Sequence, residues 1–282
     1  MNFSNQTIFI QVKDHSISKE DFELLIDDDL QLLKTYPQPT LGNLPKYYES
    51  EDYISHTDGK RSLFEKMYQT IKSYSLNKKV SLINSYHPQK GIILDIGSGT
   101  GDFLATAKNK GWEITGIEPN EKAKNIAISK GVPFTENLEK LKNNSFDVIT
   151  MWHVLEHVPN IKQQISELKR LLKPNGTIII AVPNFKSYDA KYYRSYWAAY
   201  DVPRHLWHFS KIAIEKLFAQ QDLKLIKILP MVFDSFYVSL LSEKYKNGKM
   251  NFLKAFYIGL LSNVKAKQTL EYSSHIYVIK NS

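Results

Sequence analysis

Cysteine is absent from this sequence of 282 residues. Without thiols the chain has no disulfide framework, no zinc site built from thiolates and no cysteine nucleophile. Long apolar runs are absent too, since none reaches the ~18 residues that a membrane-spanning helix needs. The first residues also lack the basic start and apolar centre of a secretory signal peptide. We therefore predict a cytoplasmic protein with no transmembrane segment and no metal centre.

Acidic residues are scarce in most of the chain, although the first 60 residues are rich in them. The net charge is +8, so the rest of the chain is strongly basic. A basic body attracts nucleic acid or an anionic surface. The lysines, however, are spread over several predicted helices and do not gather with aromatic residues on one strand face. We interpret them as a solvated surface and do not predict nucleic acid as a partner.

A glycine-rich turn organises the middle of the chain. Residues 92–103 read IILDIGSGTGDF, which predicts a buried strand, a turn and the start of a helix. This order opens a doubly wound sheet, in which ligands bind where the strands end. Because glycine has no Cβ, such a turn lets a ligand approach the backbone closely.

The spacing of the glycines separates two classes of cofactor. The dinucleotide fingerprint G-x-G-x-x-G is missing, because Asp102 stands where its third glycine would be. The observed pattern over residues 95–101 is D-x-G-x-G-x-G. It resembles the first motif of the class I S-adenosylmethionine-dependent methyltransferases. The donor in that family is a sulfonium cation, whose charge carboxylates can offset, whereas they would repel a pyrophosphate.

Carboxylates surround this turn in the sequence. Asp95 precedes it, Asp102 follows it, and Glu118 ends the next predicted strand. Glu118 stands where a carboxylate can accept hydrogen bonds from both hydroxyls of a nucleotide ribose. The sequence therefore favours S-adenosylmethionine as the cofactor over a nicotinamide dinucleotide.

A second stretch carries the same resemblance. Residues 152–158 read WHVLEHV, similar to the H-x-L-E-H-x signature of the ubiquinone-biosynthesis-like branch of these methyltransferases. The D/N-P-P-Y/F motif of enzymes that methylate amino groups of DNA bases is missing here. The resemblance implies a set of cofactor-binding residues at the ends of the strands. They are Asp95, Gly97, Ser98, Gly99, Gly101, Asp102, Phe103, Glu118, Pro119, Asn137, Leu138, Trp152 and His153.

Methyl transfer to a hydroxyl needs aligned reactants, exclusion of water and a base. Histidine suits the base near neutral pH, and predicted edge loops carry His153, His205 and His208. The last two belong to YDVPRHLWHFS, which resembles a D-x-P-R-H-L-x-H-F-S stretch of the same branch. In that stretch Arg204 can hold an acidic acceptor or pair with Asp201. We take the three histidines and Arg204 as candidate catalytic residues, although each histidine can equally hold its loop together.

Strands and helices alternate from residue 87 onward, which predicts an α/β fold. The resemblance implies a Rossmann-like doubly wound sheet of seven strands, the last of them antiparallel. We divide the chain into an N-terminal appended segment (1–60), a cap helix (61–86), a methyltransferase domain (87–230 and 271–282) and a helical insertion (231–270). The insertion either packs on the core as helices or forms a lid over the substrate.

The appended segment departs from the family pattern. Relatives carry a small cysteine-based zinc ribbon before a Y-Y-x-S-x-x-Y-I-S-H stretch, which residues 47–56 match here. Because the ribbon cysteines are missing, the segment must fold without the metal or dock on the rest of the protein.

The resemblance implies an enzyme that methylates a small-molecule acceptor, at a hydroxyl oxygen. Three alternatives stay open at this point. The basic body would suit an RNA methyltransferase. The chain could also be a regulator that binds S-adenosylmethionine without turnover. Finally, residues 231–261 could contact a membrane surface.

Overall fold

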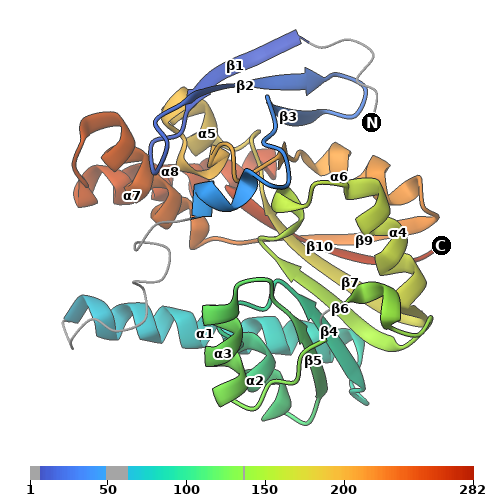
Figure 1. Cartoon of the computed structure of the whole chain (residues 1–282). Helices are drawn as coiled ribbons and strands as arrows, with labels where there is room; N and C mark the ends of the chain where they lie inside the picture. The colour runs from blue at the N-terminus through green and yellow to red at the C-terminus, as the bar shows by residue number, and fades with distance from the viewer. Residues whose placement is uncertain (1–6, 49–62, 136) are drawn as a thin grey trace.

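The computed structural model describes residues 7–48, 63–135 and 137–282. A large mixed sheet carries helices on both faces, and a small antiparallel sheet lies beside it (Figure 1). Within these residues, no helix has both the length and the apolar character needed to cross a bilayer.

The large sheet contains the core strands of the α/β fold. They are β4 (Ile92–Ile96), β5 (Glu113–Ile117), β6 (Phe146–Trp152), β7 (Leu172–Pro183), β9 (Leu223–Pro230) and β10 (Ser274–Asn281). Their order is β5-β4-β6-β7-β10-β9. Strands β4 to β7 pair in parallel, and β10 is antiparallel to both of its neighbours. The Rossmann-like fold with an antiparallel last strand is therefore confirmed.

Residues 131–134, which the sequence pattern predicts as the third strand of the large sheet, form much less of a strand than expected. Phe134 forms one isolated parallel bridge with Gly116 of β5. The large sheet thus has six full strands in the described part of the chain, where seven were expected. Pro133 has no N–H to donate, and a proline of this kind limits pairing at a sheet edge.

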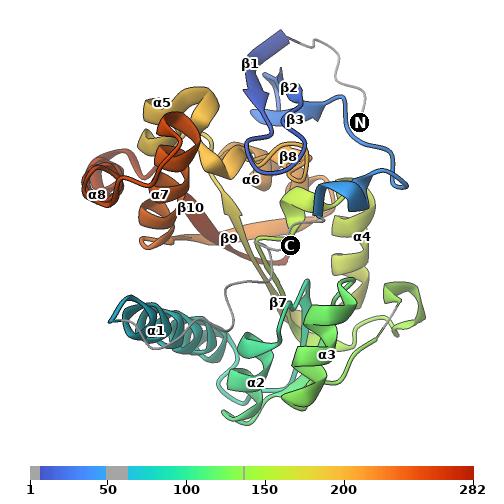
Figure 2. The same ribbon diagram turned by 60° about the vertical axis from the view of Figure 1, so that its left-hand side comes forward.

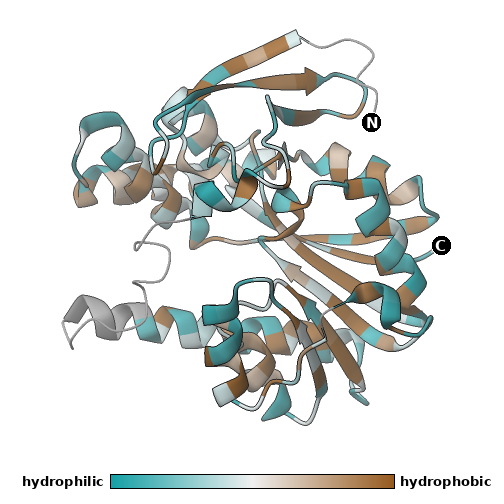
Figure 3. Ribbon diagram, viewed as in Figure 1, coloured by the Kyte–Doolittle hydropathy of each residue, from teal (hydrophilic) through white to brown (hydrophobic). Residues whose placement is uncertain are grey.

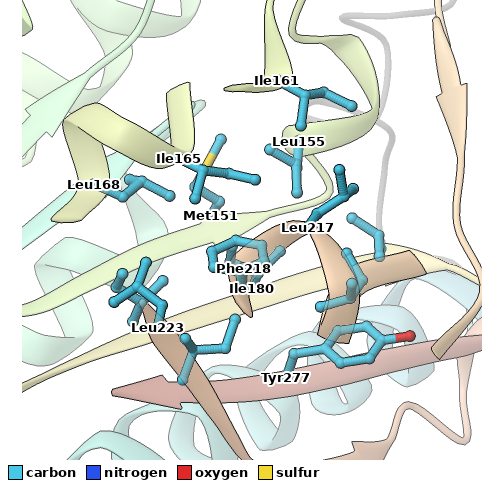
Figure 4. Packing of buried hydrophobic residues seen from close by; sticks show 14 of the residues in the cluster. Met151, Leu155, Ile161, Ile165, Leu168, Ile180, Leu217, Phe218, Leu223 and Tyr277 are labelled. Atoms are coloured by element: carbon cyan, nitrogen blue, oxygen red, sulfur yellow. The ribbon is translucent and has the colours of Figure 1, made fainter. Parts of the chain in front are cut away.

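Side chains that alternate along the strands form two apolar cores. On one face, Met151 and Ile180 pack against α4 (Ile161–Leu171) and α6 (Lys211–Ala219), as Figure 4 shows. On the other face, the strands pack against α1 (Leu63–Tyr86), α2 (Asp102–Lys108) and α3 (Glu121–Ser129). Figure 3 shows hydrophobic residues concentrated in these central strands. Ser210 caps α6, since its Oγ accepts a hydrogen bond from Ala213 N at the start of this helix.

The small sheet joins the beginning of the chain to its middle. It consists of β1 (Thr7–Lys13), β2 (Asp21–Asp27), β3 (Leu32–Tyr36) and β8 (Trp207–His208), in that order. Its apolar side chains share one core with residues that follow β7, such as Tyr193 and Trp197. The described part of the appended segment therefore docks on the rest of the protein. Residues 49–60 of this segment lie outside the described residues.

The insertion between β9 and β10 folds as two packed helices. They are α7 (Asp234–Asn247) and α8 (Phe252–Thr269). Both also contact α5 (Tyr188–Tyr193), which follows β7. Figures 1 and 2 show α7, α8 and α1 on the same side of the molecule, with α7 and α8 above α1 in both views. The carboxyl end of β6 leads into this region through Trp152.

Candidate active site

The turn between β4 and α2 leaves open space beside its backbone. Gly97 and Gly99 both have positive φ, 70° and 53°. A Cβ on Gly97 would lie 2.4 Å from Cγ2 of Val154, so no side chain fits there. A Cβ on Gly99 would meet nothing within 4 Å. The chain can therefore accept a ligand against the backbone at Gly99.

Glu118 lies next to this turn, at the end of β5. Its Oε2 accepts a hydrogen bond from Gly99 N at 2.8 Å, and its Oε1 accepts one from Asn120 N at 2.8 Å. Each carboxylate oxygen has capacity for a further hydrogen bond. Glu118 is thus fixed by the backbone and can still accept hydrogen bonds from a ligand.

A positive charge already lies in the predicted cofactor region. Lys79 of α1 places its Nζ 4.1 Å from the centroid of the Trp152 ring. Burial lowers the pKa of Lys79, while the charges of Asp95 and Asp234 oppose this. Burial also raises the pKa of Asp95 to about 7, against a hydrogen bond from Thr150 and the charge of Lys79. The aromatic face of Trp152 and the carboxylates of Asp95 and Asp234 therefore stabilise a cation in this region.

The indole N–H of Trp152 is available to donate a hydrogen bond. Its Nε1 is buried and has no hydrogen-bond partner among the described residues. Its ring meets Phe103 edge-on, at 5.4 Å between centroids. A buried N–H without a partner is costly, so a ligand atom that accepts from it would be stabilised.

Asp102 is less available than the sequence suggests. Lys72 and Lys130 approach its carboxylate at 2.8 and 2.7 Å. Burial raises the pKa of Asp102, but the bonds from the two lysines outweigh this and lower it overall. Two cations of the chain therefore already offset its charge.

The other predicted cofactor residues lie around the same strand ends. Ser98 N donates to Ile117 O at 3.0 Å, and Gly101 is the N-cap residue directly before α2. Pro119 is exposed directly after Glu118. Asn137 caps a short 3-10 helix that starts at Leu138, because its side chain accepts from Glu139 N at 2.8 Å. Their roles toward a cofactor stay predictions.

His153 lies between two carboxylates. Its Nδ1 is 3.4 Å from Oε1 of Glu156, and its Nε2 is 3.1 Å from Oδ2 of Asp234. Burial lowers the pKa of His153, but the hydrogen bonds and charges of Asp234 and Glu156 raise it to about 10. Because His153 directly follows Trp152, this imidazole belongs to the region that holds Lys79.

Glu156, which lies beside His153, also lies close to two further histidines. Glu156, His157 and His205 each offer one ligand atom, and these atoms lie within 4.8 Å of one another. The rings of His157 and His205 are 4.6 Å apart. Burial and the charge of His205 lower the pKa of His157 to about 4. Such a set could hold a metal ion, so the expectation of no metal centre remains a prediction.

The remaining candidates hold the loop to its surroundings. His205 shares a hydrogen bond between its Nδ1 and Ala199 O at 2.9 Å. His208 is buried, with its Nε2 3.1 Å from Oγ1 of Thr35. Burial lowers the pKa of His208 well below its usual value. Among the four candidate residues, His153 is the one for which the described residues show an ion pair with the insertion, through Asp234.

Arg204 joins the loop to the N-terminal segment. Its Nη2 lies 2.7 Å from Asp201 and 3.1 Å from Asp14, and its Nη1 donates to Tyr47 O at 3.0 Å. Of the two alternatives for Arg204, pairing with Asp201 is therefore present in the structure. Its role toward an acceptor stays a prediction.

Two residues of this site were missed from the sequence, Lys79 and Asp234. Lys79 is one of several lysines on α1, and nothing in its neighbours separates it from a solvated residue. Asp234 opens α7, where an acidic residue is expected in any case because it favours a helix N-terminus. Both reach the site through the packing of helices.

A comparison with protein families decides the identity of the chain. A family model described as a methyltransferase domain matches residues 68–228, more than half of the chain. This range includes the glycine turn, Glu118 and His153. The chain belongs to the class I S-adenosylmethionine-dependent methyltransferases.

Curated relatives agree with this family. The methyltransferase is 27% identical over 207 residues to the ubiquinone biosynthesis O-methyltransferase of Rickettsia felis, covering 67% of this chain and 84% of the relative. It is 31% identical over 151 residues to the protein of the same name from Rickettsia canadensis, covering 49% of this chain and 63% of the relative. The match to the proteins of that name from Proteus mirabilis and Haemophilus ducreyi covers less than half of the length of each relative, 42% and 45%.

Solved structures show the same fold. Magnesium protoporphyrin IX methyltransferase from Synechocystis PCC 6803 with bound SAH has a TM-score of 0.57 and 14% identity, over 86% of this chain and 100% of that chain. A putative sarcosine dimethylglycine methyltransferase from Galdieria sulphuraria has a TM-score of 0.51 and 14% identity, over 76% and 86%. Likeness at this identity concerns the fold alone.

The residues of the methyltransferase fit its cofactor. S-adenosylmethionine supplies a methyl group on a positively charged sulfur. The region around Trp152 already holds the cation of Lys79, with the carboxylate of Asp95 nearby. Glu118 has free acceptor capacity beside the open space at Gly99. We therefore expect the side chain of Lys79 to move aside when the donor cation binds.

Alanine at the two glycines should separate stability from binding. We expect Gly97→Ala to lower the melting temperature of the methyltransferase, because its Cβ would overlap Val154. Gly99→Ala should cost only about 1 kcal/mol of stability for its positive φ, yet weaken binding of S-adenosylhomocysteine. Thermal melts with and without S-adenosylhomocysteine measure both effects. Equal thermal stabilisation by the ligand in wild type and Gly99→Ala would contradict the assignment of the open space.

Proposed function

We propose that the methyltransferase transfers the methyl group to a hydroxyl oxygen of a small molecule, with His153 as the base. The observation that carries this proposal is the position of His153, between Asp234 and Glu156 and next to the cation-holding Trp152. A hydroxyl must lose its proton as it attacks, so a base beside the donor serves this reaction directly. The relatives named as O-methyltransferases support the same choice of acceptor atom.

Each neighbour of His153 has a role in the proposed reaction. Glu156 is fully buried, and at Nδ1 it orients the ring and stabilises the imidazolium that forms. Nε2 then takes the proton of the acceptor hydroxyl, after the carboxylate of Asp234 has moved away from Nε2. Because Asp234 begins α7, the insertion contributes directly to the acceptor side of the site.

The acceptor class is tested by product release. Purified enzyme is incubated with S-adenosylmethionine and a panel of phenols and catechols, beside a panel of anilines with the same ring substituents. We expect release of S-adenosylhomocysteine with hydroxyl acceptors and a methyl ether as product, identified by mass spectrometry. Methylation of the anilines alone would overturn the proposal. Tight cofactor binding without turnover of either panel, or of RNA, would favour the regulator.

The pH dependence should report the base. His153 must be neutral to accept a proton, and its pKa is raised to about 10. Below that pH the neutral fraction grows tenfold per pH unit, so log kcat/KM should rise with a slope near one between about pH 7 and 9. Asp234→Asn removes a charge that raises this pKa, so its profile should break at a lower pH. A flat wild-type profile, or identical profiles for both proteins, would contradict the assignment.

A further inference from the structure

Helix α8 exposes bulky apolar side chains and buries small ones, which is the reverse of the usual pattern of a surface helix. Its buried face consists mainly of small residues: Ala255, Ile258, Gly259, Ser262 and Ala266. Its bulky apolar side chains point outward instead. Leu253 is 87% exposed, and Phe256 and Tyr257 are 61% and 62% exposed. A surface helix normally turns its large apolar residues to the core, so this outward face calls for a partner.

The outward residues form one continuous stripe. Leu253, Phe256, Tyr257, Leu260 and Val264 follow the spacing i, i+3, i+4, i+7 and i+11. Residues at these positions lie along the same face of an α-helix. The stripe therefore runs along three turns of α8, a helix that Figure 2 shows at the outer side of the molecule.

The charges around this stripe are of one sign. The insertion, residues 231–270, carries six lysines and two carboxylates. Both carboxylates are already engaged, Asp234 with His153 and the fully buried Glu243 with Lys254 at 3.4 Å. Lys249 and Lys267 are exposed near the two ends of α8. The surface that α8 presents is thus apolar along its stripe and positive at its borders.

We propose that the outward face of α8 docks on the surface of an anionic phospholipid bilayer. A helix with aromatic and aliphatic residues on one face and lysines beside them can lie in the plane of the interface, with its apolar side among the acyl chains. The lysines then meet the negative headgroups. A two-fold dimer through the same face would instead bring the lysines of both copies together, with no exposed carboxylate of the insertion to pair with them.

Co-sedimentation with vesicles tests this docking. The full chain is mixed with phosphatidylcholine vesicles and with vesicles of equal parts phosphatidylcholine and phosphatidylglycerol. We expect sedimentation with the anionic vesicles, reduced at high salt because screening weakens the attraction of the lysines. Leu253→Glu combined with Phe256→Glu should reduce partitioning at least ~tenfold, since two buried apolar groups are lost. Lys249→Glu combined with Lys267→Glu should reduce it ~tenfold on anionic vesicles.

Ile128→Glu provides the matched control. Ile128 is 50% exposed on α3, which lies far from α8 in both views of the molecule (Figures 1 and 2). This variant should sediment like wild type. Light scattering of each protein without lipid completes the experiment, and we expect a particle mass that Leu253→Glu with Phe256→Glu leaves unchanged. The proposal is overturned if wild type ignores anionic vesicles, if the paired glutamates leave sedimentation unchanged, or if they convert a dimer to a monomer.

Discussion

Replacing Glu118 with alanine is expected to weaken binding of S-adenosylhomocysteine about 100-fold. The carboxylate is placed by Gly99 N and Asn120 N, each at 2.8 Å, with acceptor capacity left for the ribose hydroxyls. A hydrogen bond to a charged group contributes about 1.5–3 kcal/mol, and 1.4 kcal/mol corresponds to a factor of ten in affinity. Two such bonds therefore account for the expected loss. Isothermal titration calorimetry with the purified variant measures it.

Glu121 offers a matched control three residues later. Its carboxylate is 74% exposed, and its ion pair among the described residues is with Lys124, at 3.5 Å. Glu121→Ala should therefore bind S-adenosylhomocysteine like wild type, although it removes the same charge from nearly the same place. Circular dichroism of both variants shows whether they fold. A folded Glu118→Ala protein with wild-type affinity would remove Glu118 from the cofactor site.

Replacing His153 with glutamine is expected to lower kcat by a factor of about 10²–10⁴, the usual contribution of a general base. Glutamine keeps hydrogen-bonding capacity toward Glu156 and Asp234, the two partners of the ring, but it accepts no proton near neutral pH. Affinity for S-adenosylhomocysteine should change little, because the loss concerns the acceptor side. Steady-state kinetics on the best hydroxyl acceptor, with calorimetry on the same protein, separates the two effects.

His87→Gln is the control for this second prediction. His87 follows α1 and lies 2.9 Å from the hydroxyl of Thr177, away from the ends of the parallel strands. Its replacement should leave kcat near the wild-type value. If His153→Gln loses cofactor affinity in proportion to kcat, His153 binds the donor and is not the base.

Glu118 could be placed from the sequence because parallel strands end at a common edge. Once β4 and β5 were predicted, the carboxylate after β5 had to lie near the turn after β4. The length of a strand is less predictable, and residues 132–134 show why. Their pattern suits a strand, but Pro133 has no N–H to donate, and in the described part of the chain Phe134 alone of these three residues forms a bridge.

Lys79 and Asp234 could not be placed in the same way. Each comes from a helix, and the position of a helix over a sheet depends on how many side chains pack at once. The sequence predicts a cap helix over residues 61–86, but its periodicity does not select Lys79 among the lysines of that helix. Asp234 belongs to an insertion far along the chain from His153, and the two residues meet only in the folded structure.

The pairing of β3 with β8 has a consequence for folding while the chain is still being synthesised on the ribosome. Strands β1 to β3 are synthesised well before β8, yet Leu33 pairs with His208, and Val12 and Phe22 share a core with Trp197. During synthesis the apolar side of β1 to β3 therefore stays uncovered until residues 197–208 have also emerged from the ribosome. A nascent chain in that interval presents unpaired strand edges, which are the surfaces that chaperones protect from aggregation.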